Sequence, residues 1–296
     1  MKELVLGTRG SALARAQSEL VAAALRALGL GVHLAVIATR GDRDTSAPVR
    51  GLGGIGFFTS ELEQALLARR VDVAVHSLKD LPTRATAGLL VAAVPKRDDW
   101  RDALVSRHPG GFRGLPPRAR VGTASLRRRS LLLNARPDLE IVDLRGNVDT
   151  RLERVAQGEL DAVVVAAAGL VRLGRADAIA ERLEFLPAPG QGALAVQAHA
   201  DRDDVVDALR ALHDPRTDEC VQAERALLAA LEGGCSVPVG ALAVAEAGRI
   251  RLEGCVGSVD GRTVLRVGAS GDEPQALGWD VAHKLRAMGA EALLRA

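Results

Sequence analysis

The sequence has few cysteines, few lysines and no long hydrophobic run. Its three cysteines are odd in number and widely spaced, at Cys220, Cys235 and Cys255. This spacing fits neither a disulfide framework nor a paired-cysteine metal site, so we expect reduced thiols and no metal. No apolar stretch approaches the roughly 20 residues that a membrane-spanning helix requires. A membrane partner is therefore not expected.

The charge is nearly balanced, with a formal net charge of +2. A nucleic-acid-binding protein normally shows a marked basic surplus or stripe, so no nucleic-acid partner is expected. The N-terminal sequence MKELVLGTRG lacks the pattern of a signal peptide, and we expect a cytoplasmic protein. Arginine supplies nearly all the positive charge, and a lysine at position 79 stands out against that trend.

The stretch RRVDVAVHSLKDLP, residues 69–82, contains the strongest candidate for chemistry. The apolar run 71–75 predicts a buried strand, and Pro82 prevents it from continuing. Ligands bind beyond the carboxyl ends of strands in α/β sheets, which makes Lys79 and Asp80 the first candidates for catalysis. A solvated ion pair in a turn is the alternative for this segment taken alone.

The 296 residues are enough for two or three domains, and the chain shows an internal repeat. GTRGSALARAQ (7–17) is matched by VGTASLRR (121–128), and VDVAVHSLKDLP (71–82) by LDAVVVAAAGLVRLG (160–174). Each half has the order strand, glycine turn, helix, strand ending in Arg-Gly, helix, buried strand. We expect two similar α/β domains whose equivalent strand ends line a cleft.

Several of these strand ends carry groups suited to anions. Ser11 is a predicted helix N-cap, and with Arg9 it would suit a carboxylate or phosphate at the helix N-terminus. The second half places five arginines at strand ends or helix starts, and together they indicate a ligand with several carboxylates. A plain capping turn and solvated surface side chains are the alternatives. The five are Arg127, Arg128, Arg145, Arg151 and Arg172.

The last third predicts a smaller α+β domain. PGQGALAVQ indicates a crossover into a strand that rejoins the first domain, and a helix beginning at Thr217 precedes an antiparallel meander and a final helix, Gln275–Leu294. Cys235 lies in the glycine-flanked loop LEGGCSVPVG and is the expected exposed thiol, whereas Cys220 and Cys255 are expected in the core. The expected domains are residues 1–95 with 191–212, residues 96–190, and residues 213–296.

Seven motifs, in order along nearly the whole chain, resemble those of the porphobilinogen deaminase (hydroxymethylbilane synthase) family: GTRGSALARAQ, VDVAVHSLKDLP, GTASLRR, LRGNVDTRL, AAAGLVRLG, PGQGALAVQ and LEGGCSVPVG. The resemblance implies two periplasmic-binding-protein-like α/β domains, a smaller C-terminal α+β domain and a monomer. It also implies a dipyrromethane cofactor joined by a thioether to Cys235. Onto this cofactor such enzymes condense porphobilinogen head to tail with loss of ammonia, and they then release the linear tetrapyrrole hydroxymethylbilane by hydrolysis.

The resemblance also implies residue roles. Asp80 would be catalytic, steadying positive charge and assisting proton transfer, with Lys79 beside the cofactor. The growing chain is a polycarboxylate, and the matching positions for binding it are Arg9, Ser11, Asp42, Lys79, Thr123, Ser125, Arg127, Arg128, Arg145, Arg151 and Arg172. Departures from the family pattern are Ile55, Ala124 and Asp149. The competing hypothesis is a non-catalytic binding protein for an anionic small molecule, in which Cys235 is a chance thiol.

Overall fold

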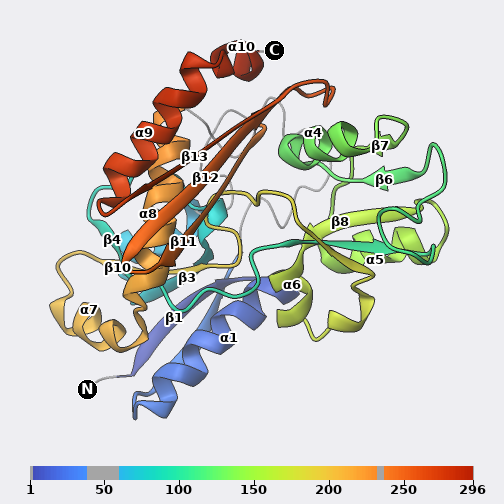
Figure 1. Ribbon diagram of the computed structural model, residues 1–296. Coiled ribbons are helices and arrows are strands. Elements are labelled where there is room, and N and C mark those ends of the chain that lie inside the picture. Colours follow the sequence, from blue (N-terminus) through green and yellow to red (C-terminus); the bar gives the residue numbers. More distant parts are fainter. Residues whose placement is uncertain (1–2, 39–59, 232–236, 296) are drawn as a thin grey trace. The chain divides into compact units, whose positions relative to one another are not determined.

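The computed structural model describes residues 3–38, 60–231 and 237–295 (Figure 1). The chain divides into two compact units. Unit 1 comprises Met1–Asp98 and Ala193–Asp218, and unit 2 comprises Asp99–Gly192 and Glu219–Ala296. Unit 2 thus contains both the second α/β segment and the C-terminal segment. The three domain boundaries expected from the sequence stay a prediction.

Unit 1 is built on a five-stranded sheet of order β2-β1-β3-β10-β4. β1 is parallel to β2 and β3, whereas β10 is antiparallel to β3 and β4. The position of β10 confirms that the chain returns to the first sheet after PGQG. The strands are β1 (Leu4–Arg9), β2 (Val32–Ile37), β3 (Val73–Ser77), β4 (Leu89–Ala93) and β10 (Leu194–His199), and the helices are α1 (Ala12–Ala27), α3 (Ser60–Leu67), α7 (Asp203–Leu209) and the 3-10 turns η1 (Leu78–Asp80) and η3 (Arg210–Leu212).

Unit 2 contains a sheet of the same design, with order β7-β6-β8-β5-β9. β6 is parallel to β7 and β8, and β5 is antiparallel to β8 and β9. Each sheet therefore has one antiparallel strand, β10 or β5, in its fourth position. The elements are β5 (Asp102–Ser106), β6 (Arg120–Gly122), β7 (Glu140–Val142), β8 (Ala162–Ala166), β9 (Glu181–Leu183), α4 (Leu126–Ala135), α5 (Val148–Ala156), α6 (Ala167–Arg172) and the 3-10 turn η2 (Ala176–Ala178).

The central strands are apolar on both faces because helices cover each face. In unit 1, Val73 and Val75 of β3 pack into the core that α1 closes, while Ala74 belongs to a second cluster with Leu62 and Leu66 of α3. The strand β8 of unit 2 divides its side chains between two clusters in the same way. This explains why both strands read in the sequence as continuous apolar runs.

The C-terminal segment forms a three-stranded antiparallel sheet, β11-β12-β13, packed against helices. This confirms the predicted meander and, with the two α/β sheets, the predicted fold class. The final helix is two helices, because Gly289 interrupts it with a positive φ of 98° that favours glycine. The elements are α8 (Pro215–Ala230), β11 (Val239–Glu246), β12 (Arg249–Gly257), β13 (Val264–Gly271), α9 (Pro274–Ala287) and α10 (Ala290–Arg295).

The C-terminal sheet is tied to the α/β part of unit 2 by hydrogen bonds between distant residues. The Ala241 N–H donates to Pro187 O over 2.9 Å, and Asn134 Nδ2 donates to Gly261 O over 2.9 Å. Cys220 and Cys255 are buried, as expected for core thiols, and burial raises the pKa of Cys255. Among the described helices, none has the length and apolarity to cross a bilayer.

Candidate active site

In unit 1 the predicted catalytic residues lie in a tight turn at the end of β3. The Leu78 N–H donates to Ala193 O over 3.0 Å, which attaches the start of η1 to the segment that enters β10. Lys79 and Asp80 follow within η1, and both side chains are half-buried. Gln17 of α1 donates from Nε2 to Ser77 Oγ over 2.8 Å. The turn is therefore held by two elements besides its own strand.

Arg9 and Ser11 flank the junction between β1 and α1. Ser11 is the N-cap of α1, and its side chain accepts a hydrogen bond from the Ala14 N–H over 3.3 Å, which confirms the predicted cap. Arg9 is the last residue of β1 and is half-buried. Asp42 and Ile55 lie outside the described residues.

The corresponding junction in unit 2, between β6 and α4, contains Thr123 and Ser125. Ser125 caps α4 by accepting a hydrogen bond from the Arg128 N–H over 3.4 Å. Thr123 is buried, and its hydroxyl accepts a hydrogen bond from the Ser125 N–H over 3.2 Å. The two hydroxyls thus order the turn at the helix N-terminus, where amide donors gather.

Arg127 and Arg128 turn into the interior of unit 2 and share Asp102, a fully buried carboxylate at the start of β5. Arg127 Nη1 lies 2.7 Å from Asp102 Oδ2, and Arg128 Nη2 lies 2.8 Å from Oδ1. Burial opposes ionisation, but the positive charges of the two guanidinium groups hold the pKa of Asp102 well below its usual range. The three side chains form one buried charged cluster.

This cluster gives two of the predicted ligand-binding arginines partners inside the protein. Arg127 also donates to Leu186 O over 2.9 Å, and Arg128 to Val164 O over 3.0 Å, so protein oxygens accept from both side chains. Ligand binding by Arg127 and Arg128 stays a prediction, and Asp102 is a carboxylate inside the protein that accepts from both guanidinium groups. The pattern missed it because Asp102 lies about 25 residues earlier in the chain.

The other three arginines of the second half lie at the edge of the sheet where β7 and β8 end. Arg145 is exposed in the turn after β7, and Arg151 on α5 donates from Nε to Gly146 O over 3.0 Å. Arg172, at the end of α6, is half-buried and donates to Gly192 O over 2.7 Å. Asp149 pairs with Arg175 over 3.4 Å. These arginines keep the surface position that ligand binding requires.

Sequence reasoning also missed three buried polar side chains in unit 1. His76 of β3 contacts Gln197 of β10, which in turn contacts Glu63 of α3. Burial is the main cause that lowers the pKa of His76 to about 4. Nothing in the sequence around His76 identifies Gln197, 121 residues away, and nothing around Gln197 identifies Glu63, 134 residues away.

A fourth buried group, Glu224 of α8, links the C-terminal segment to the PGQG turn. Its carboxylate accepts from the Gly190 N–H over 2.7 Å and from the Ala243 N–H over 2.8 Å. These bonds join the PGQG turn and the middle of β11 to α8, and β11 is the strand that follows the segment carrying Cys235. Cys235 itself lies outside the described residues.

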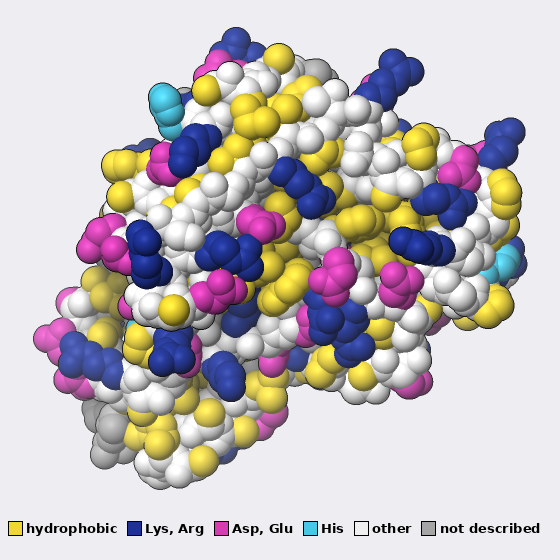
Figure 2. Space-filling model, in the orientation of Figure 1, with side chains coloured by type: hydrophobic (Ala, Val, Ile, Leu, Met, Phe, Trp, Pro, Cys, Tyr) yellow, Lys and Arg dark blue, Asp and Glu magenta, His cyan; other side chains and the backbone are white. Residues whose placement is uncertain are grey.

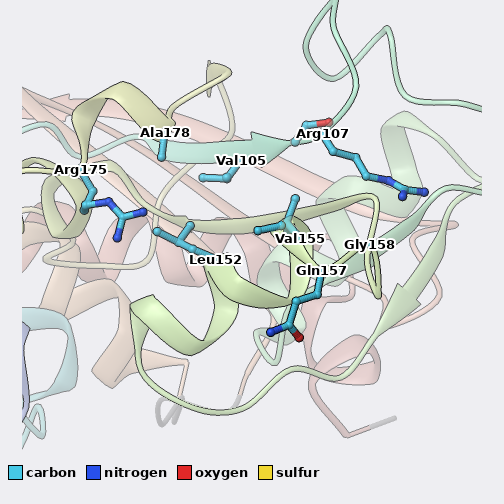
Figure 3. Close-up of a pocket in the computed structure, with 10 residues that line it drawn as sticks. Val105, Arg107, Leu152, Val155, Gln157, Gly158, Arg175 and Ala178 are labelled. Atoms are coloured by element: carbon cyan, nitrogen blue, oxygen red, sulfur yellow. The ribbon is translucent and has the colours of Figure 1, made fainter.

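A cavity of about 490 Å³ in unit 2 is separate from these residues (Figure 3). It lies beside α5 and β5, with Leu152 and Val155 forming its apolar wall and Arg107 and Arg175 at its margins. None of the site residues predicted from the sequence lines it. The predicted site residues of unit 2 lie at the strand ends and not in this cavity.

The fold and these strand ends define a class: an α/β protein with paired sheets that presents arginine, serine and lysine side chains suited to an anionic ligand. Residues 4–207 match the family model described as "Porphobilinogen deaminase, dipyromethane cofactor binding domain", and residues 219–287 match the C-terminal domain of the same enzyme. The chain belongs to the porphobilinogen deaminase family.

Full-length relatives agree with this assignment. The porphobilinogen deaminase of Rubrobacter xylanophilus is 50% identical, and the match covers 98% of this chain and 96% of the relative. That of Syntrophobacter fumaroxidans is 47% identical over the same shares of the two chains.

Solved structures give more distant matches. A putative methionine-binding lipoprotein from Bacillus subtilis superposes with a TM-score of 0.46 at 14% identity, covering 73% of this chain and 92% of the other. A periplasmic substrate-binding protein from Coxiella burnetii has the same TM-score at 14% identity, covering 75% and 96%. Similarity at this level does not bear on function.

Proposed function

We propose that this chain is a hydroxymethylbilane synthase, a transferase that condenses porphobilinogen head to tail onto a covalent dipyrromethane and releases hydroxymethylbilane by hydrolysis. The observation that carries the proposal is the match of residues 4–207 to the cofactor-binding domain of the family. Arginines and hydroxyls at the strand ends support it, because a chain of pyrroles with acetate and propionate arms is a polycarboxylate.

The described residues fit such a cofactor by their chemistry. Arg145, Arg151 and Arg172 all follow strands that end at one edge of the unit 2 sheet, and Ser125 adds a hydroxyl at the same edge. Guanidinium groups bind carboxylates in a bidentate manner and keep their charge when partly buried. When bound through Cys235, the dipyrromethane supplies the terminal pyrrole to which new units are added.

Asp80 is the residue proposed to assist the chemistry. Loss of ammonia from porphobilinogen leaves a cation, and a carboxylate next to a pyrrole nitrogen stabilises that positive charge and accepts or returns a proton. Asp80 is half-buried in a turn fixed by the Leu78 to Ala193 hydrogen bond, which limits its freedom to move. Lys79 beside it provides a positive charge for a carboxylate arm.

The enzyme is proposed to act as a cytoplasmic monomer, with porphobilinogen and the growing oligopyrrole as its ligands and without nucleic-acid or membrane partners. The balanced charge supports the absence of a nucleic-acid partner, since the net charge is +2 and cationic and anionic side chains are mixed over the face drawn in Figure 2. A surface of this kind offers no broad basic band for a polyanion.

Intact-protein mass spectrometry tests the proposal. The wild-type protein should carry an added mass equal to two linked pyrroles, and peptide mapping should place it on Cys235. Cys235→Ala should lose both the added mass and porphobilinogen consumption, whereas Cys220→Ala, the matched control, should keep both. An acidic aldehyde reagent should colour the wild type and not Cys235→Ala. Active protein with an unmodified Cys235 would contradict the proposal.

A further inference from the structure

Unit 1 contains a buried chain of three polar side chains that the proposed chemistry does not use. His76 Nε2 lies 3.1 Å from Gln197 Oε1, and Gln197 Nε2 lies 3.0 Å from Glu63 Oε1. The residues are 5%, 4% and 9% exposed, respectively. They come from β3, β10 and α3, so the chain joins three elements on one face of the sheet. We call these residues the relay.

The relay determines which nitrogen of His76 holds the proton. Gln197 uses its amide nitrogen to donate to Glu63, which leaves its carbonyl oxygen to face the imidazole. An oxygen acceptor requires a donor, so His76 Nε2 must bear the hydrogen. Nδ1 of the neutral ring is then the acceptor. Burial and the nearby positive charge of Arg9 both oppose a second proton, while the Gln197 bond works in the other direction.

Arg9 is the cationic neighbour of His76. The strands β1 and β3 are parallel, and Gly7 pairs with Ala74. Two residues after this pair, Arg9 of β1 lies beside His76 of β3. Paired residues of neighbouring strands project to the same face of a sheet. The groups that face His76 are thus the Arg9 guanidinium from β1, the Gln197 amide from β10 and, beyond it, the Glu63 carboxylate from α3. A neutral imidazole is compatible with this arginine, whereas an imidazolium would repel it.

The unit 2 sheet shows that the fold does not need the relay. In unit 2, β5 pairs Ala103 with Val165, and in unit 1 β10 pairs Ala195 with His76, so Val165 is the equivalent of His76. Gln197 lies two residues after Ala195, and its equivalent, two residues after Ala103, is Val105. The equivalent of the polar pair in unit 2 is therefore two valines, both buried in one hydrophobic cluster.

We propose that His76 is a positioning residue for Arg9, and that Gln197 and Glu63 hold it as the neutral Nε2–H tautomer. A polar uncharged ring beside Arg9 supports the arginine at the end of β1 without competing for an anion. The inference rests on the proposed function in one respect, namely that Arg9 binds a carboxylate of the substrate or cofactor.

The tautomer is tested first, by a measurement that needs no activity. Protein labelled with ¹⁵N-histidine has six histidines, and the His76 signal is identified by its loss in His76→Gln. Wild type should show a protonated Nε2, an unprotonated Nδ1 and no titration near pH 6.5. Gln197→Glu places a carboxylate on the ring and should raise the titration midpoint of His76 by about one to three pH units. A protonated Nδ1, or an unchanged midpoint, would overturn the relay.

Kinetics then test the effect on Arg9. The double variant His76→Val with Gln197→Val installs the side chains of the unit 2 sheet and should remain folded by circular dichroism. Its apparent KM for porphobilinogen should rise about tenfold, the usual effect of weakening one charge-assisted hydrogen bond, with kcat within about twofold. His76→Gln keeps an uncharged N–H donor and should restore the wild-type KM. His199→Gln, a histidine of the same sheet outside the relay, is the matched control.

Each remaining outcome is decisive. If the double variant has the same KM as His199→Gln, His76 does not position Arg9. The same conclusion holds if kcat falls as much as KM rises in the double variant and His76→Gln does not restore it. Wild-type protein without porphobilinogen turnover would instead contradict the proposed function, and the NMR result would still decide whether the relay holds His76 neutral.

Discussion

The two α/β sheets share a topology but differ in their buried polar groups. In both, an aspartate just before one strand accepts a hydrogen bond from the backbone of its parallel neighbour. Asp72, before β3, accepts from the Val5 N–H of β1 over 2.9 Å, and Asp161, before β8, accepts from the Arg120 N–H of β6 over 2.8 Å. This shared contact fixes strand register. Beyond it, unit 1 buries the relay of His76, Gln197 and Glu63, and unit 2 buries a cluster of two arginines around Asp102.

The difference shows that equivalent positions of the two sheets accept either a polar or an apolar side chain. The position of Asp102 on β5 corresponds to Leu194 on β10, because these residues pair with Ala166 and Ser77, the last residues of β8 and β3. Topology therefore does not require a charge there. The shared topology is therefore compatible with different buried polar groups in the two sheets.

The largest expected effect concerns Asp80. Ala74 of β3 and Val163 of β8 occupy equivalent positions in the two sheets, and six residues beyond them lie Asp80 in unit 1 and Gly169 in unit 2. Asp80→Asn keeps the shape and removes the charge, so folding should persist while turnover falls by about two to four orders of magnitude. Steady-state porphobilinogen consumption measures this, with exposed Asp203→Asn as the control. Wild-type turnover in Asp80→Asn would exclude the residue from the mechanism.

Removing the carboxylate of the charged cluster should strongly destabilise unit 2. Asp102→Asn removes the buried carboxylate charge that Arg127 and Arg128 share, which should lower the free energy of unfolding by about 3 to 5 kcal/mol. Urea denaturation measures the loss. Asp138→Asn removes a carboxylate paired with Arg136 near the surface, where solvent screens the pair, and should lower the free energy of unfolding far less. Equal losses in the two variants would contradict the structural role of the cluster.

The buried imidazole of His76 should make the protein sensitive to acid. His76 binds a proton in the unfolded chain near pH 6.5 but in the folded protein only near pH 4. The unfolded state thus binds more protons between these values, and stability falls as the pH drops, by up to about 1.4 kcal/mol per pH unit. His76→Gln should lack this component.

Urea denaturation between pH 7 and pH 4.5 tests this difference. The unfolding free energy of wild type should decrease more steeply than that of His76→Gln, and the two curves should run parallel above pH 7. Parallel curves throughout the range would show that His76 titrates alike in both states.

The smallest expected effect is the loss of stability when alanine replaces one of two equivalent glycines, Gly7 or Gly122. A Cβ on Gly122 of β6 would lie 2.8 Å from Leu144 Cδ2 and Leu160 Cδ1, whereas on Gly7 of β1 the closest atom, Val71 Cγ2, would lie at 3.1 Å. Gly122→Ala should therefore destabilise by about 1 to 3 kcal/mol and Gly7→Ala by less. Thermal unfolding of both variants ranks them, and the reverse order would mean that the unit 2 core relaxes more easily.

The sequence by itself determined the elements and their repetition. Apolar runs bounded by glycine and proline identified β3 and β8, and the serine caps at Ser11 and Ser125 marked helix starts, because these signals depend on neighbours within one or two turns. Family motifs pointed to the cofactor-binding domain that the comparison confirmed. Even the return of β10 to the first sheet followed from the PGQG crossover.

Only the tertiary structure decided the partners of the buried polar groups. Nothing near Arg127 and Arg128 in the sequence predicts that both contact Asp102. Nothing near His76 predicts its contact with Gln197, or the contact of Gln197 with Glu63. The reason is physical. A charge or amide taken out of water must find a partner, but the partner is chosen by proximity in space, which local sequence patterns do not encode.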